Sequence, residues 1–271
     1  MASNLLDDNI EDILRTVLED TDETLLVVNP SVTAIEELID VAREVSDLPE
    51  IRLLGDESML KDVMSDFILA SNAADLIEED ALTLKLLEDE NENSLLISSQ
   101  RVVALVNVGD TVAGLTTDDA DFVDVAYDAY TTTWEEASAF NLRTPPLSRV
   151  RSTLSEDIGE GVEDDFTGVL GSLQTARGDG DGLDEVTISL LVAAKNEVLL
   201  YDISKWGEDV GIASKATFSR TKTRLEDMGL IDTEKVPIDV GRPRLRLKFG
   251  DERLYEANTD QLASVAQNLL N

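Results

Sequence analysis

Short apolar runs that alternate with helical periodicity constrain the fold of this chain more than any other feature. Two runs, TLLVV at 24–28 and IRLL at 51–54, have the length of buried strands. A segment with apolar residues at helical spacing follows each run, around Ile35 and around Met59. Strands that alternate with helices predict an α/β domain with a mixed, partly parallel sheet.

The pattern then changes to apolar runs separated by short polar links. These runs cover residues 82–87, 94–98, 101–108 and 111–117. Such links are typical of hairpins, so we expect an antiparallel meander that extends the sheet. A stripe that contains Tyr130 and Trp134 predicts a helix with a core-facing side rather than a cofactor site. The apolar spacing of residues 3–19 predicts a first helix, with Ser3 as its N-cap.

The segment RGDGDG, residues 177–182, has the composition of a linker. It interleaves charged residues with glycines and contains no apolar residue. We therefore predict an α/β sensor or dimerisation domain over 1–176, a linker over 177–183 and a second domain over 184–271.

The second domain has the order helix, helix, tight turn, helix, two-stranded hairpin. Gly211 is expected to end the second helix, Ser214 to cap the third and Gly229 to follow the third. The segment 206–231, WGEDVGIASKATFSRTKTRLEDMGLI, resembles the winged helix-turn-helix family. This resemblance implies DNA binding, with the third helix in the major groove.

The side of the third helix that would meet DNA follows from its periodicity of 100° per residue. Phe218 is taken as the centre of the buried side, which then includes Leu225 and Met228, and Arg220 falls on the opposite side. The candidate DNA-binding residues of this helix are Lys215, Thr217, Ser219, Arg220, Lys222, Thr223 and Arg224.

We assign these candidates different roles. Arg220 is the candidate for bidentate contact with a guanine, and the hydroxyl residues Thr217, Ser219 and Thr223 are candidates for bases or phosphates. Lys215, at the positive end of the helix dipole, suits a phosphate. Lys222 lies nearer the buried edge and is expected to reach the DNA backbone.

The hairpin, or wing, continues this basic character. Arg242 and Arg244 lie near its tip, where they could reach phosphates or a minor groove. Residues 214–248 contain nine basic and five acidic residues, a net charge of +4 in a chain whose net charge is −35. This contrast favours DNA binding, and the main alternative is a winged helix that binds another protein.

The extreme acidity of the rest of the chain resembles that of proteins adapted to molar salt, whose surface carboxylates keep them hydrated. The other interpretation is an acidic protein that mimics or sequesters a basic partner. Acidic runs such as DDAD at 118–121 are expected in a chain with 57 Asp and Glu, and we assign them no metal.

Several chemistries are excluded or disfavoured. The chain has no Cys and no His, which excludes disulfides, imidazole zinc sites and Ser-His triads. No phosphate-binding glycine loop appears, so we expect no enzyme and no cofactor, although a carboxylate or lysine site stays open. No apolar run approaches about 20 residues, which predicts a cytoplasmic protein with no membrane partner.

An α/β domain followed by a winged helix in a very acidic chain is similar to haloarchaeal transcriptional regulators related to the TrmB group (TbsP-like). This resemblance implies binding to double-stranded promoter DNA of sugar or central carbon metabolism, usually as a homodimer. The TrmB group commonly places its DNA-binding domain first, so sugar sensing does not carry over and any effector is unknown. A ligand-binding α/β protein without DNA binding remains an alternative.

Apolar residues also recur along the last segment, 252–270, at Leu254, Leu262, Val265 and Leu269. Such a helix either pairs with its symmetry mate in a dimer or packs on the first domain.

Overall fold

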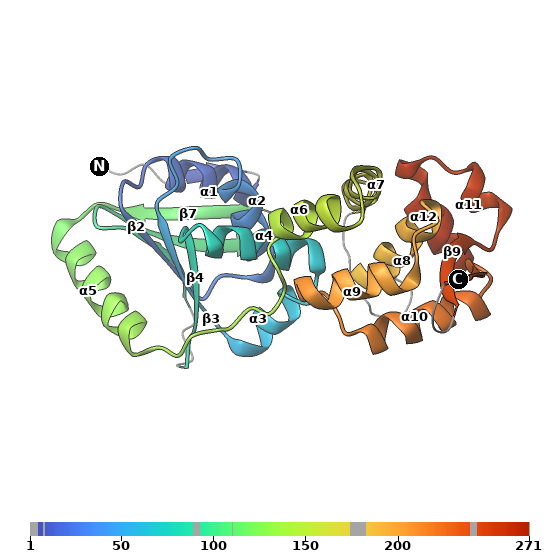
Figure 1. Cartoon of the computed structure of the whole chain (residues 1–271). Helices are drawn as coiled ribbons and strands as arrows, with labels where there is room; N and C mark the ends of the chain where they lie inside the picture. Colours follow the sequence, from blue (N-terminus) through green and yellow to red (C-terminus); the bar gives the residue numbers. More distant parts are fainter. Residues whose placement is uncertain are drawn as a thin grey trace. The chain divides into compact units, whose positions relative to one another are not determined.

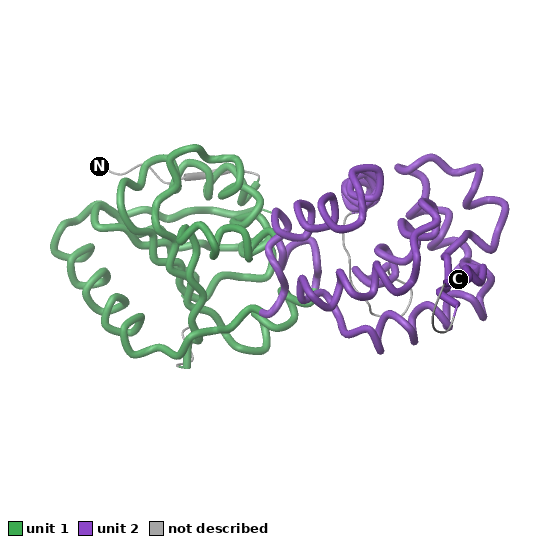
Figure 2. The backbone as a smooth tube through the Cα atoms, viewed as in Figure 1, with its two compact units in different colours: residues 1–65, 72–142 green, residues 66–71, 143–271 purple. Residues whose placement is uncertain are grey.

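The computed structural model describes residues 5–7, 9–88, 93–109, 111–173, 183–238 and 243–270. The chain forms two units (Figure 2), the first from residues 1–65 and 72–142 and the second from residues 66–71 and 143–271. The first is an α/β unit and the second is helical with a hairpin, which confirms the predicted fold class. The linker predicted at 177–183 lies, except for Leu183, outside the described residues, and the domain boundary there stays a prediction.

The first unit is built on a seven-stranded mixed sheet (Figure 1), with the order β1-β7-β6-β5-β2-β3-β4. The strands are β1 Leu5–Asp7, β2 Thr24–Val28, β3 Glu50–Gly55, β4 Leu82–Leu86, β5 Ser94–Ile97, β6 Val102–Val108 and β7 Thr111–Thr117. Strands β2, β3 and β4 are parallel to one another, whereas every other neighbouring pair is antiparallel. The alternation of strands and helices therefore predicted the parallel part correctly.

The expected meander is present only from β5 to β7. The link at 88–93 does not close a hairpin, because β4 pairs in parallel with β3 and β5 pairs with β2. The segment before β4 is a helical crossover, which returns the chain parallel to β3. The free edge of β2 is then the place where the antiparallel strands join.

The helices of the first unit are α1 Ile10–Glu19, α2 Val32–Ala42, α3 Glu57–Val63 and α5 Ala120–Glu136, together with the part of α4 Phe67–Glu78 from residue 72 onward. The expected helix over 3–19 is too long at its start. Asn9 caps α1 by accepting a hydrogen bond from the Glu11 amide, at 3.0 Å. Residues Leu5–Asp7 instead pair with β7, and Ser3 lies outside the described residues.

Helix α5 covers part of one sheet face. Its buried residues Val123 and Trp134 pack with Leu26 and Ile97 of the sheet. The ammonium of Lys85 lies 4.8 Å from the centre of the Trp134 ring and also donates to the Trp134 carbonyl, at 2.7 Å. The aromatic stripe of this helix is thus part of a core, as predicted.

The second unit contains seven helices among its described residues and one hairpin. The helices are α6 Leu147–Asp157, α7 Glu160–Gly171, α8 Glu185–Lys195, α9 Leu200–Val210, α10 Lys215–Asp227, α11 Glu252–Glu256 and α12 Thr259–Leu270, and the strands are β8 Ile231–Val236 and β9 Arg244–Phe249. Phe166, Trp206 and Phe218 are among its largest buried side chains. Phe166 meets Trp206 edge to face, with ring centres 6.4 Å apart, and this core holds the three helices of the winged helix together.

The C-terminal apolar stripe is used within the chain. Helix α12 packs on α7, and Leu262 is buried against the core of the second unit. A polar cluster reinforces this contact, because Lys195 Nζ lies 2.6 Å from Asp165 Oδ1 and donates to Thr259 Oγ1. Of the two arrangements expected for this stripe, the structure therefore shows packing within one chain, on α7, which lies inside the predicted first domain 1–176.

Candidate nucleic-acid interface

Local signals in the sequence set the start and the direction of α10. Gly211 ends α9 with a positive φ of 97°, a conformation that favours glycine. Ser214 then caps α10, since its hydroxyl oxygen accepts a hydrogen bond from the Thr217 amide at 3.2 Å. Both expectations for this turn are confirmed.

A close approach of α9 and α10 fixes the angle between these helices. A Cβ atom on Gly207 would lie only 2.3 Å from the Phe218 ring. The ring therefore occupies the space that any side chain at position 207 would need. Because Phe218 is fully buried in this position, the opposite side of α10 must face outward.

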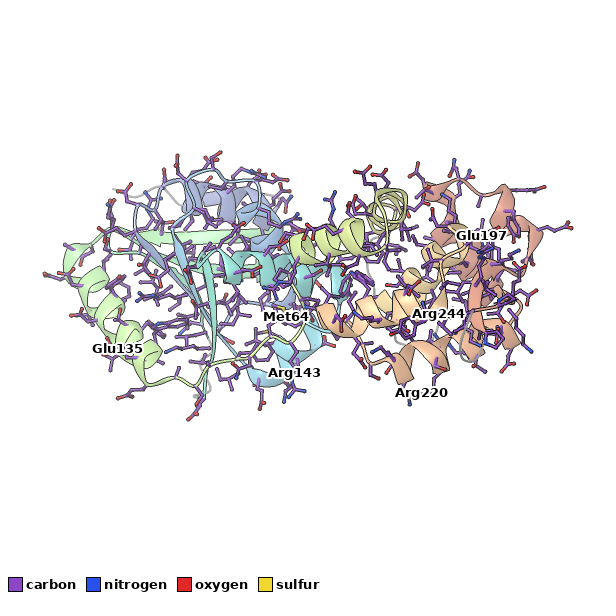
Figure 3. All side chains as sticks on the ribbon, viewed as in Figure 1. Met64, Glu135, Arg143, Glu197, Arg220 and Arg244 are labelled. Carbon is purple, nitrogen blue, oxygen red and sulfur yellow. The ribbon has the colours of Figure 1, made fainter. Side chains whose placement is uncertain are left out.

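The exposure of the α10 side chains matches the predicted periodicity, with one exception. Phe218 and Leu225 are fully buried. Ala216, Ser219, Arg220, Thr223 and Arg224 are exposed, and Arg220 projects outward from the helix (Figure 3). Met228, expected on the buried side, is 41% exposed because α10 ends at Asp227 and Met228 is its C-cap.

Arg220 and Arg224 are the cations of α10 that carry no ion pair within the part of the chain that the structure describes. An Arg220 guanidinium nitrogen lies 3.4 Å from Thr217 Oγ1, at the limit of a hydrogen bond. Arg224 donates to Thr187 Oγ1 of α8, at 3.2 Å. Neither contact neutralises a charge, so two positive charges one helical turn apart remain available on the exposed side.

Lys215 is placed differently from the expectation of a free phosphate ligand. Its ammonium lies 2.6 Å from Glu208 Oε2, and its backbone amide donates to Glu208 Oε1 at 3.2 Å. These hydrogen bonds raise the pKa of Lys215 and lower the pKa of Glu208. A phosphate at the start of α10 would have to compete with this carboxylate.

Lys222 is also paired. Its side chain is buried on the edge of α10, and its ammonium lies 2.7 Å from Glu226 Oε2. Glu226 in turn accepts a hydrogen bond from Thr233 Oγ1 of β8, at 2.8 Å. Lys222 thus helps to connect α10 to the hairpin, and its ammonium does not reach outward as we expected.

The basic face of the hairpin is largely neutralised by acids. Arg244 lies 3.3 Å from Asp202, Arg246 lies 4.0 Å from Glu197, and Lys248 lies 2.8 Å from Glu234. Asp202 and Glu197 stand outside residues 214–248, so the count of +4 overstates the local positive charge. Arg242 lies outside the described residues, and its role stays a prediction.

Sequence reasoning missed one exposed aromatic residue beside the hairpin. Tyr201, in the first turn of α9, is 47% exposed, and the Arg244 guanidinium lies over its ring at 4.3 Å. Both residues line an open cavity of about 450 Å³ together with Leu200, Ser204, Ile238, Pro243 and Leu245. An exposed aromatic residue at the start of the second helix was the available signal.

The described ranges contain neither a membrane-spanning helix nor a cluster of metal ligands. None of the helices found there is both long enough and apolar enough to cross a bilayer. In the same ranges, no group of three or more carboxylates is placed to hold a metal ion.

Comparison with known families gives two matches that together cover most of the chain. The model described as the N-terminal part of TbsP-like transcriptional regulators matches residues 2–145. The model described as their C-terminal HTH domain matches residues 146–267. None of the curated proteins compared with the chain matches it.

Three solved structures match about half of this chain each. One is TrmBL2, an archaeal chromatin protein whose structure is described as showing a novel mode of DNA binding, with 14% identity, 51% of this chain and 54% of that chain covered, and a TM-score of 0.37. The phospholipase D family member Nuc from Salmonella typhimurium has 6% identity, coverage of 51% and 98%, and a TM-score of 0.37. NucT from Helicobacter pylori has 14% identity, coverage of 51% and 99%, and a TM-score of 0.35. The present chain therefore spans about half of the TrmBL2 chain.

Proposed function

The chain belongs to the TbsP-like family of transcriptional regulators, and from this premise we propose that it binds specific promoter sequences through α10. The exposed side of α10, with Arg220 free of any acidic partner in the described chain, is the observation that carries the proposal. The proposed targets are genes of sugar or central carbon metabolism, and the proposed compartment is the cytoplasm.

The proposed contact places the first half of α10 in a major groove. Arg220 would donate two hydrogen bonds to the O6 and N7 atoms of one guanine, which distinguishes that base pair from the other three. Ser219, one residue earlier, and Thr223, nearly one turn later, are exposed beside it. Their hydroxyls can donate or accept, so they fit bases or phosphates on either side of the guanine.

Phosphate contacts are proposed for cations around this helix side. Arg224 and Lys235 are exposed, and neither has an ion pair within the described chain. Arg244 would also have to leave its acid, Asp202, before its guanidinium could join the Tyr201 hydroxyl at a phosphate near the hairpin. Lys215 would join them only after leaving Glu208, which makes its phosphate contact conditional.

The charges support adaptation to high salt. The net charge of −35 repels DNA in dilute buffer, but the screening length falls to about 3 Å at 1 M salt. Because few cations of the protein are unpaired, binding neutralises few phosphates and releases few counterions from the DNA. Added salt therefore weakens binding little. We propose a halophilic, haloarchaeal protein in which hydrogen bonds to bases carry the specificity.

Chromatin immunoprecipitation in the native host tests the proposed function, with Arg220→Ala compared with Arg143→Ala. Arg143 is a matched control because it is exposed and has no ion pair in the described chain. We expect discrete promoter peaks that disappear with Arg220→Ala and persist with Arg143→Ala. An absence of peaks for the unaltered chain would favour a winged helix that binds protein.

We also propose that the regulator acts as a homodimer, since a two-fold protein reads two half-sites of a palindromic operator. The buried stripe of α12 leaves the position of that dimer contact open.

A further inference from the structure

Exposed apolar side chains gather in one stretch of the first unit. Among its described residues, six large apolar side chains are exposed, and five of these lie between positions 106 and 125. They are Val106 at 39%, Val108 at 72%, Leu115 at 47%, Phe122 at 56% and Val125 at 70%. Single exposed apolar residues are common, but a group of this kind marks a contact surface. We call these five residues the β6–β7 patch.

The strand register places the first three on the same sheet face. Val106 lies opposite Ala113, and Leu115 lies opposite Ala104. Directly opposite residues share a face, as do alternate residues along one strand. Val102 shares this face and belongs to the core under α5. The helix therefore covers the face near β5 and leaves the Val106–Val108 end of it open.

The other two members lie on the first turns of α5, directly after β7. Val123 of the same helix is buried against the sheet, whereas Phe122 and Val125 are more than half exposed. Because they are three residues apart, they occupy the same flank of the helix. The exposed apolar residues of the strands are thus followed, directly in the chain, by an exposed apolar flank of α5.

The charge of this stretch is unusual for the chain. Residues 102–117 contain one charged residue, Asp110, although 29% of the whole chain is charged. Four acids follow closely, Asp118, Asp119, Asp121 and Asp124. The strand part of the patch is therefore an almost uncharged surface, with an acidic border on its α5 side.

We propose that a second copy of this chain covers the β6–β7 patch in a two-fold dimer. Two molecules that each carry a net charge of −35 repel each other least where their facing surfaces carry little charge. A two-fold contact places the same patch of both molecules at the interface. A basic partner would instead be attracted to the carboxylates that border the patch. This inference deepens the proposed homodimer, and it needs no DNA.

The acidic borders predict how salt changes the dimer. In the dimer, two copies of the border lie close together and repel each other. The screening length falls from about 10 Å at 0.1 M salt to about 3 Å at 1 M. Self-association therefore strengthens as salt is added, the opposite of what a contact between opposite charges would show.

Sedimentation equilibrium of the full chain tests the proposal at low and at molar KCl. The variant carries Val108→Asp and Leu115→Asp, and the control carries Val32→Asp, an exposed valine at the start of α2. We expect dimers of the unaltered chain and the control at molar KCl, and a dissociation constant raised more than about 100-fold in the double variant. Equal melting temperatures check that the folds are intact.

Disulfide trapping gives a second measurement, because the chain has no cysteine of its own. We expect Val108→Cys to form covalent dimers on mild oxidation at molar KCl, and Val32→Cys to remain monomeric. The proposal is overturned if the double Asp variant dimerises as well as the unaltered chain, or if the unaltered chain stays monomeric in molar KCl. Either result leaves DNA binding by a monomer testable on its own.

Discussion

Replacement of Glu208 by Gln tests whether an acid of α9 restrains the cation at the start of α10. In the unaltered chain, Glu208 holds the Lys215 ammonium at 2.6 Å. Gln has no negative charge, so in the variant Lys215 is free to bind a phosphate. Both side chains are more than 40% exposed, so the loss of this pair should change the melting temperature little.

The expected size of the effect follows from counterion release. One additional phosphate contact changes the slope of log K against log salt by about −0.9. Over a tenfold decrease in salt, from about 1 M to about 0.1 M, this amounts to about an eightfold gain in affinity. The gain should be nearly the same for any duplex, because a phosphate contact carries no sequence information.

Fluorescence anisotropy with labelled duplex, titrated over a range of KCl, measures this slope. Asp209→Asn is the matched control, because Asp209 pairs with Lys205 and its loss removes the same charge without releasing Lys215. An unchanged slope in Glu208→Gln would refute the reasoning. Equal slopes in the two variants would show that the change in net charge, and not the release of Lys215, alters the salt dependence of binding.

Three further predictions concern the fold that positions α10. Gly207→Ala should lower the free energy of unfolding by about 1–3 kcal/mol, because its Cβ would meet the Phe218 ring at 2.3 Å. Gly171→Ala has open space around it and should raise the free energy of unfolding by about 0.5–1 kcal/mol. Urea unfolding of the two variants measures both changes. Lys222→Ala should lower the free energy of unfolding by about 1–3 kcal/mol in the same assay, while DNA affinity at molar salt stays nearly constant. A large loss of DNA affinity would contradict a purely structural role for the Lys222–Glu226 pair. Burial raises the pKa of Glu185, so the folded state binds its proton more tightly; Glu185→Gln should therefore raise the melting temperature at pH 7, and the difference should shrink as pH falls through the pKa of the folded state. A constant difference down to acid pH would be evidence against that burial effect.

The sequence predicted those features that depend on neighbouring residues. Phe218 and Leu225 lie seven residues apart, and two helical turns place both on the buried side of α10. Gly211 and Ser214 act within one turn of the chain, so their roles could be read directly. The exposed position of Arg220 follows from the same local geometry.

The features that escaped prediction depend on distant parts of the chain. The turn between α9 and α10 brings Glu208 back to Lys215, and the fold brings Asp202 to Arg244 across 42 residues. The predicted hairpin between β4 and β5 was wrong for the same reason, because β5 pairs with β2, a strand distant in the sequence. Counting charges along a segment cannot detect acids that folding brings in from outside.

Arg220 is proposed to read a base, while most other cations near α10 in the described chain are already paired. The most direct test is the ratio of affinities for a selected operator and a scrambled duplex, measured by anisotropy in about 1 M KCl, where nonspecific attraction is screened. Loss of one bidentate contact is worth about 1–3 kcal/mol, so Arg220→Ala should lower this ratio about 5- to 150-fold, and Arg143→Ala should leave it unchanged. An unchanged ratio in Arg220→Ala would contradict the account.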